Sequence, residues 1–120
     1  MSDLEKFKSE MPTERWRKSM SDTEFPDEFF TEENIAETEK ILVNYIDSLA
    51  NIRDENEQGK IMKLVEEVVV KFNELNGEHD YFIETLEREE LAEFIQLVAV
   101  SAGLVLENEY DDVTEEWREW

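Results

Sequence analysis

Three segments of this chain place apolar residues three or four positions apart, and only three glycines and two prolines interrupt its 120 residues. That spacing is typical of amphipathic helices, whereas a small all-β domain needs frequent turns rich in glycine and proline. The length suits one domain. We therefore predict an all-α fold: a small helical bundle of three main helices with short N-terminal and C-terminal helical segments, forming a single acidic domain over residues 1–120.

The first two main helices have recognisable boundary signals. Thr31 is a favoured N-cap residue for the first helix, and Asp54 or Asn56 can cap the second. The second helix is expected to end at Asn76-Gly77, because Gly77 can adopt the left-handed conformation that terminates helices. The apolar stripes are Ile35, Leu42, Tyr45, Ile46, Leu49 and Ile52 in the first helix and Ile61, Leu64, Val65, Val68, Phe72 and Leu75 in the second.

The third main helix is expected to run from near Asp80 to residues 101–102, with Gly103 as its stop. Residues 94–106 are apolar almost all round, so this segment is predicted to be a central element that its neighbours cover on every side. A strand over residues 104–106 is the weaker alternative. The predicted buried face consists of Leu86, Leu91, Phe94, Ile95, Val98 and Ala102.

The two ends of the chain are predicted to close the bundle. A short helix is expected after Pro12, and residues 1–20 are expected to form a loosely packed N-terminal strap. Thr114 can cap a final helical turn in which Trp117 and Trp120 share a face.

Acidic residues dominate the charge of the chain. Its 12 basic and 33 acidic side chains give a formal charge of -21, so the surface carries a large negative potential. Residues 22–39 hold eight carboxylates without a base, and residues 107–119 hold seven with one arginine. Solubility alone needs far less charge than this. We predict a basic protein as partner, with no direct binding to nucleic acid or membranes.

The sequence offers little support for an enzyme or a metal protein. Residues 54–61 resemble the first part of a calcium-binding loop, but Val65 stands at the twelfth position, where the bidentate carboxylate is needed. His79 is the only histidine, and the carboxylate pair Glu84 and Glu87 is one of many that such a composition produces by chance. Nucleophile, phosphate-loop and zinc-protease motifs are missing. We expect no catalytic residue, no cofactor and no metal site.

Cysteine is absent, which removes disulfides and thiolate metal sites. The N-terminal residues lack the apolar stretch of a secretory signal, and no window has the length of a membrane span. A cytoplasmic location is the resulting expectation.

Arg88 follows Glu84 by four residues, a spacing that allows an ion pair within a helix. A partly buried arginine that organises the bundle is the alternative. The candidate partner-binding residues are carboxylates and aromatic anchors in two segments: Asp80, Tyr81, Glu84, Glu107, Glu109, Tyr110, Asp111 and Asp112.

A spaced set of short motifs resembles the bacterial family known as DUF5713, over roughly residues 16–120. The motifs are Phe25-Pro26, Phe72-Asn73-x-Leu75, Glu84-Thr85-x-x-Arg88, Phe94-Ile95 and Trp117-Arg118-x-Trp120. The chain departs from the family at Leu64-Val65, where a Thr-His pair is expected. The resemblance implies a bacterial helical domain and adds no catalytic residue, because the family is uncharacterised.

These observations favour a non-enzymatic, acidic protein-binding module. Its most concrete form is an immunity-type inhibitor, whose acidic face would cover the basic active site of a toxin such as a nuclease. Two alternatives stay open. One is a DNA mimic, whose carboxylates would replace phosphates in a DNA-binding groove. The other is a housekeeping domain of unknown function.

Overall fold

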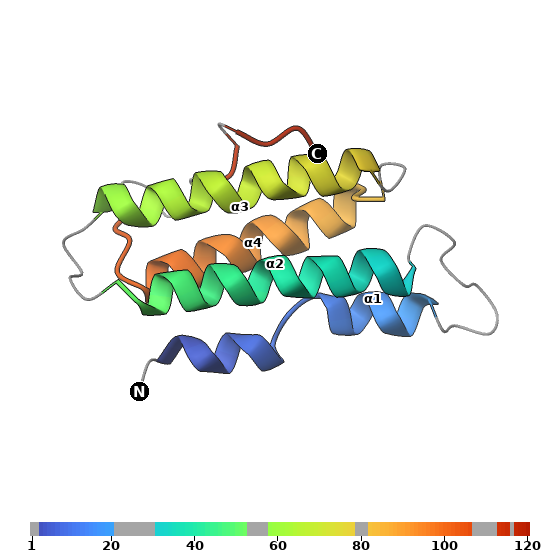
Figure 1. Ribbon diagram of the computed structural model, residues 1–120, viewed down its shortest axis with the longest axis horizontal. Coiled ribbons are helices and arrows are strands. Elements are labelled where there is room, and N and C mark those ends of the chain that lie inside the picture. Colours follow the sequence, from blue (N-terminus) through green and yellow to red (C-terminus); the bar gives the residue numbers. More distant parts are fainter. Residues whose placement is uncertain (1–2, 21–30, 53–57, 79–81, 107–112, 116) are drawn as a thin grey trace.

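The computed structural model describes residues 3–20, 31–52, 58–78, 82–106, 113–115 and 117–120, and within these ranges it has helices and no strand. A 3-10 helix and four α-helices follow one another along the chain (Figure 1). They are η1 (Asp3–Ser9), α1 (Thr13–Met20), α2 (Glu32–Ala50), α3 (Gln58–Glu78) and α4 (Thr85–Ser101). The predicted all-α bundle with three main helices is confirmed.

The N-terminal segment completes the bundle as a fourth member. Helix α3 packs against both α2 and α4, and η1 packs against the same two helices from the other side (Figure 1). Helix α1, which begins after Pro12 as predicted, also lies against α2. Leu4, Phe7, Met11 and Trp16 of this segment are all buried. The expectation of loose packing is therefore wrong for these side chains.

Aromatic side chains connect the elements inside the core. The rings of Trp16 and Phe82 pack edge to face with their centroids 6.0 Å apart. The rings of Phe7 and Phe94 pack in the same way with centroids 5.9 Å apart. Trp16 and Phe82 are fully buried, with an exposed fraction of 0%. Such pairs are favourable beyond the area that they bury. They attach the N-terminal segment to α4 and to the residues that precede it.

The helix boundaries match the predictions in part. Thr31 caps α2 through a capping box, in which its hydroxyl accepts from the backbone N–H of Asn34 at 3.1 Å and its own N–H donates to the Asn34 side chain at 2.9 Å. Gly103 follows α4 with a left-handed φ of 119°, as expected of a stop. Gly77 does not end α3, which continues to Glu78. The predicted caps of this helix at residues 54 and 56 lie outside the described residues.

Helix α4 begins at Thr85, and the prediction of a start near Asp80 is wrong for residues 82–84. Phe82 and Ile83 are buried in a non-helical segment. The backbone N–H of Ile83 donates to the side-chain oxygen of Asn76 at 2.9 Å. Because a buried N–H needs a partner, this bond between the end of α3 and residue 83 satisfies the backbone of the segment without a helix.

Helix α4 is not covered on every side, contrary to the prediction. Leu86, part of the predicted buried face, is 51% exposed, and Leu97 and Val100 are 50% and 41% exposed. Val105, beyond the helix, is 76% exposed in a segment that forms no strand. A four-membered bundle covers only the inner face of each helix, so an apolar outer face stays in contact with water.

The C-terminal residues form turns, and the predicted helical segment is not present in residues 113–115 and 117–120. Thr114 begins a turn, because its carbonyl accepts from the N–H groups of Trp117 and Arg118 at 3.3 and 3.1 Å. Asn73 on α3 then donates to the carbonyl of Trp117 at 2.9 Å and accepts from the N–H of Glu119 at 2.8 Å. These bonds satisfy the backbone without a helix.

Tyr45 links α2 to α4, because its buried hydroxyl donates to the backbone carbonyl of Ile95 at 2.8 Å. Burial raises the pKa of Tyr45 far above its ordinary value. In the unfolded chain the phenol ionises above a pH of about 10, so the unfolded state then binds fewer protons than the folded state.

We therefore predict that the free energy of unfolding decreases as the pH rises from about 9 to 11, and that Tyr45→Phe removes part of this decrease. Urea denaturation of both proteins across this range measures the difference. Equal pH slopes for the two proteins would contradict the prediction.

Candidate interaction surface

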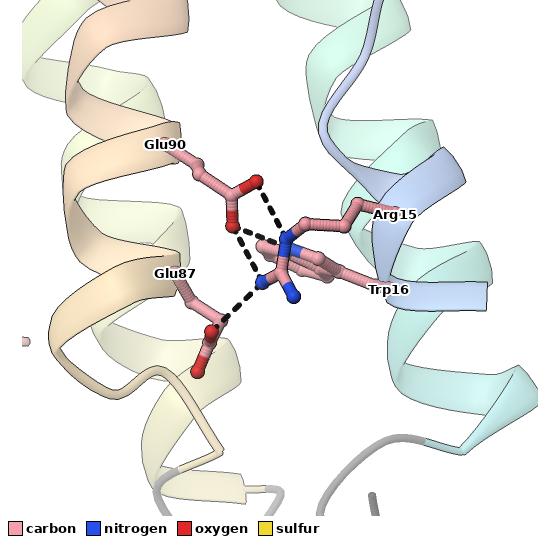
Figure 2. A network of polar contacts seen from close by, with 4 residues as sticks. All are labelled: Arg15, Trp16, Glu87 and Glu90. Atoms are coloured by element: carbon pink, nitrogen blue, oxygen red, sulfur yellow. Dashed lines mark hydrogen bonds and ion pairs between the residues drawn. The ribbon is translucent and has the colours of Figure 1, made fainter. Parts of the chain in front are cut away.

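Arg15 on α1 is bound by two glutamates of α4 (Figure 2). Its Nη2 lies 2.6 Å from Glu90 Oε1 and 2.9 Å from Glu87 Oε2, and its Nε donates to Glu90 Oε2 at 2.8 Å. The indole N–H of Trp16 donates to the same Glu90 carboxylate at 3.1 Å. This is a bidentate arginine–carboxylate pair, a strong and directional contact. Glu87 is buried, so Arg15 compensates its charge.

Two further cations of the N-terminal segment bind α2. Arg17 pairs with Glu39 and, at 3.5 Å, with Glu32, and Lys8 lies 2.8 Å from Asp47. Hydrogen bonds to carboxylates, Glu90 for Arg15 and Glu39 for Arg17, are the largest cause that raises the pKa of each guanidinium. The N-terminal segment therefore bridges two acidic helices and neutralises part of their charge.

Many of the exposed glutamates of the main helices lie at one end of the bundle. Because the main helices alternate in direction, the start of α2, the end of α3 and the start of α4 lie at the same end (Figure 1). Exposed glutamates occupy all three of these helix ends, and the lysines of the first turns of α3 lie at the opposite end. The exposed glutamates, named the acidic end below, are Glu32, Glu33, Glu37, Glu74, Glu78, Glu84 and Glu89.

Of the predicted partner-binding residues, Glu84 alone falls within the described part of the chain. It is exposed at the N-cap of α4 and belongs to the acidic end. Asp80 and Tyr81 lie outside the described residues. The same holds for the other five predicted residues, which are Glu107, Glu109, Tyr110, Asp111 and Asp112.

Arg88 does not pair with Glu84 in the described part of the structure. Its side chain is half-buried and its Nε donates to the backbone oxygen of Trp120 at 3.0 Å. The alternative of an arginine that organises the bundle is the better description, because this bond holds the C-terminal segment against α4.

Sequence reasoning missed the contact between Arg15 and Glu90, which are 75 residues apart. No pattern of residues spaced closely along the sequence predicts such a pair. The only available signal was the excess of basic residues at the start of an otherwise acidic chain. Glu87, which the sequence suggested as half of a carboxylate pair with Glu84, instead binds Arg15.

Residues 58–65, the last eight positions of the possible calcium-binding loop, lie in the helix α3, and Val65 is buried there. Residues 54–57 and His79 lie outside the described residues. Among the residues that the structure describes, no group of three or more histidine, aspartate or glutamate side chains is placed to hold a metal ion.

No helix in the described ranges has the length and apolar character that a membrane span requires. Comparisons of the chain with protein-family models, with curated proteins and with solved structures found no match.

Proposed function

We propose that this chain is a non-enzymatic, acidic protein-binding module whose partner is a basic protein. The observation that carries the proposal is the acidic end, where exposed carboxylates from three helices lie at the same end of the bundle, although Arg17 pairs with one of them, Glu32. Like charges in one region repel one another, and a basic partner would offset that repulsion.

An immunity-type inhibitor is the most concrete form of this function. The basic active site of a nuclease or similar toxin would meet the acidic end, and the electrostatic field would speed the encounter. We place this interaction in the cytoplasm of a bacterium, in keeping with the resemblance to DUF5713. Neither nucleic acid nor an anionic membrane suits the sign of the surface charge.

Affinity capture from the extract of the source cell tests the proposal. The tagged protein is incubated with extract, washed at about 0.05 M or about 0.5 M salt, and the bound proteins are identified by mass spectrometry. We expect a basic protein that is retained at low salt and largely lost at high salt. Recovery of no basic protein at either salt would refute the proposed function.

Two charge-reversed variants test whether the partner binds at the acidic end. Glu33→Lys with Glu37→Lys alters the acidic end, and Glu66→Lys with Glu67→Lys alters equally exposed carboxylates on α3. Capture should fall about tenfold or more for the first pair and less for the second, because attraction between exposed charges decays within about 8 Å at 0.15 M salt. Release of the partner by duplex DNA would favour a DNA mimic.

A further inference from the structure

The outer face of α4 carries a narrow stripe of exposed residues. Leu86, Glu89, Glu93, Leu97 and Val100 follow one another at spacings of three and four, and all five are exposed. At about 100° per residue these positions fall within an arc of about 80°, and at a rise of about 1.5 Å per residue they extend over about 21 Å. We call these five residues the α4 stripe.

The α4 stripe combines apolar ends with an acidic centre. Leu86 is 51% exposed at one end, and Leu97 and Val100 are 50% and 41% exposed at the other. Glu89 and Glu93 lie between them. Leu97 and Val100 are neighbours on this face, and adjacent exposed apolar side chains mark an interaction site more strongly than a single exposed residue does.

We propose that the α4 stripe is the docking face for an amphipathic basic helix of the protein partner. This inference rests on the proposed function and names the surface and the shape of the partner. Recognition would pair two helices side by side, and apolar side chains spaced along one face of each helix would serve as anchors. A length of about 21 Å corresponds to a partner helix of about 14 residues. Its centre would carry lysine or arginine opposite the two glutamates.

The charge of the stripe selects this occupant over a second copy of the chain. Glu89 and Glu93 are the only charged residues of the stripe, so pairing two stripes would place carboxylates against carboxylates. The nearest cation of α4 is Arg88, which is half-buried and donates to the backbone oxygen of Trp120. The same glutamates would be repelled by an anionic lipid surface.

Helix α3 supplies matched control positions. Val70 is 40% exposed, almost the same as Val100, but it is the one large exposed apolar side chain on the described α3. Glu66 and Glu67 are exposed, like Glu89 and Glu93. Glu66→Gln with Glu67→Gln matches the charge change in the stripe, and Val70→Ser repeats the change made at Val100, without altering the α4 stripe.

The test measures binding of a fluorescent 16-residue helical peptide by anisotropy at about 0.15 M salt. The peptide carries leucines toward both ends of one face and lysines between them, and a scrambled peptide of the same composition measures attraction by charge alone. The wild type is compared with two double variants of the α4 stripe, which are Leu97→Ser with Val100→Ser and Glu89→Gln with Glu93→Gln. The controls are the single variant Val70→Ser and the double variant Glu66→Gln with Glu67→Gln.

We expect each pair of substitutions in the α4 stripe to raise the Kd of the patterned peptide about tenfold. Each control should change this Kd less than about twofold. Equal binding of both peptides, or equal losses in stripe and control variants, would overturn the inference. So would dimers of the wild type that Leu97→Ser with Val100→Ser converts to monomers. Circular dichroism verifies that the variants fold, which their exposed positions favour.

The same variants separate this inference from the proposed function. If a basic protein is captured from extract equally well by the wild type and by Leu97→Ser with Val100→Ser, the docking face is wrong and the function stands. If no basic protein is captured at low salt, the proposed function fails, whatever the peptide does.

Discussion

Trp16→Ala should destabilise the protein by about 3–5 kcal/mol, the range typical of removing a large aromatic side chain from a core. Trp16 is 0% exposed and packs edge to face against Phe82 at 6.0 Å. Its indole N–H also donates to Glu90, so the substitution removes packing and a hydrogen bond to a charged acceptor together. Marginal stability makes this a large fraction of the total for a domain of this size.

Urea denaturation followed by circular dichroism measures the effect. Leu97→Ala is the matched control, since Leu97 is on the same bundle but 50% exposed, and it should cost less than about 1 kcal/mol. A change of less than about 1 kcal/mol for Trp16→Ala would show that the N-terminal segment does not complete the bundle.

Arg15→Met should lower the free energy of unfolding by about 2 kcal/mol. The substitution keeps much of the apolar stem but leaves Glu87, with 9% of its side chain exposed, beside Glu90 without their shared cation. Breaking a fully buried ion pair typically costs about 3–5 kcal/mol, whereas exposed pairs contribute about 0–1 kcal/mol. The 38% exposure of the Arg15 side chain places this pair between the two limits.

Two comparisons test the cause. Adding Glu87→Gln to Arg15→Met should restore part of the stability, because it removes a buried charge that has lost its ion pair with Arg15. Arg17→Met should cost less than about 1 kcal/mol, since its carboxylate partners are more exposed than Glu87. If Arg15→Met and Arg17→Met lower the free energy of unfolding by the same amount, burial of Glu87 does not strengthen the ion pair of Arg15.

The N-terminal segment has two physical roles that no single residue reveals. Trp16 supplies apolar area to a core that three helices leave open on one side, and Arg15 and Arg17 neutralise carboxylates on both neighbouring helices. Since Arg17 pairs with Glu32, the segment also offsets part of the charge of the acidic end. Internal packing and the proposed recognition of a basic partner therefore depend on the same segment.

Local sequence determined the number of main helices, most of their buried residues and some of their ends. Apolar spacing identified the stripes of α2 and α3, Thr31 could be assigned as an N-cap and Gly103 as a stop. These features depend on interactions between residues a few positions apart, such as the contact of a cap with the first turn. The sequence contains all of the information that such contacts need.

The tertiary structure alone decided the features that depend on distant partners. Asn76 accepts the N–H of Ile83 and so delays the start of α4, and Arg15 finds Glu90 across 75 residues. Leu97 is exposed because the bundle has neighbours on only the inner side of its helix. Burial and hydrogen-bond satisfaction are properties of assembled surfaces, so they are determined only when the helices have packed together.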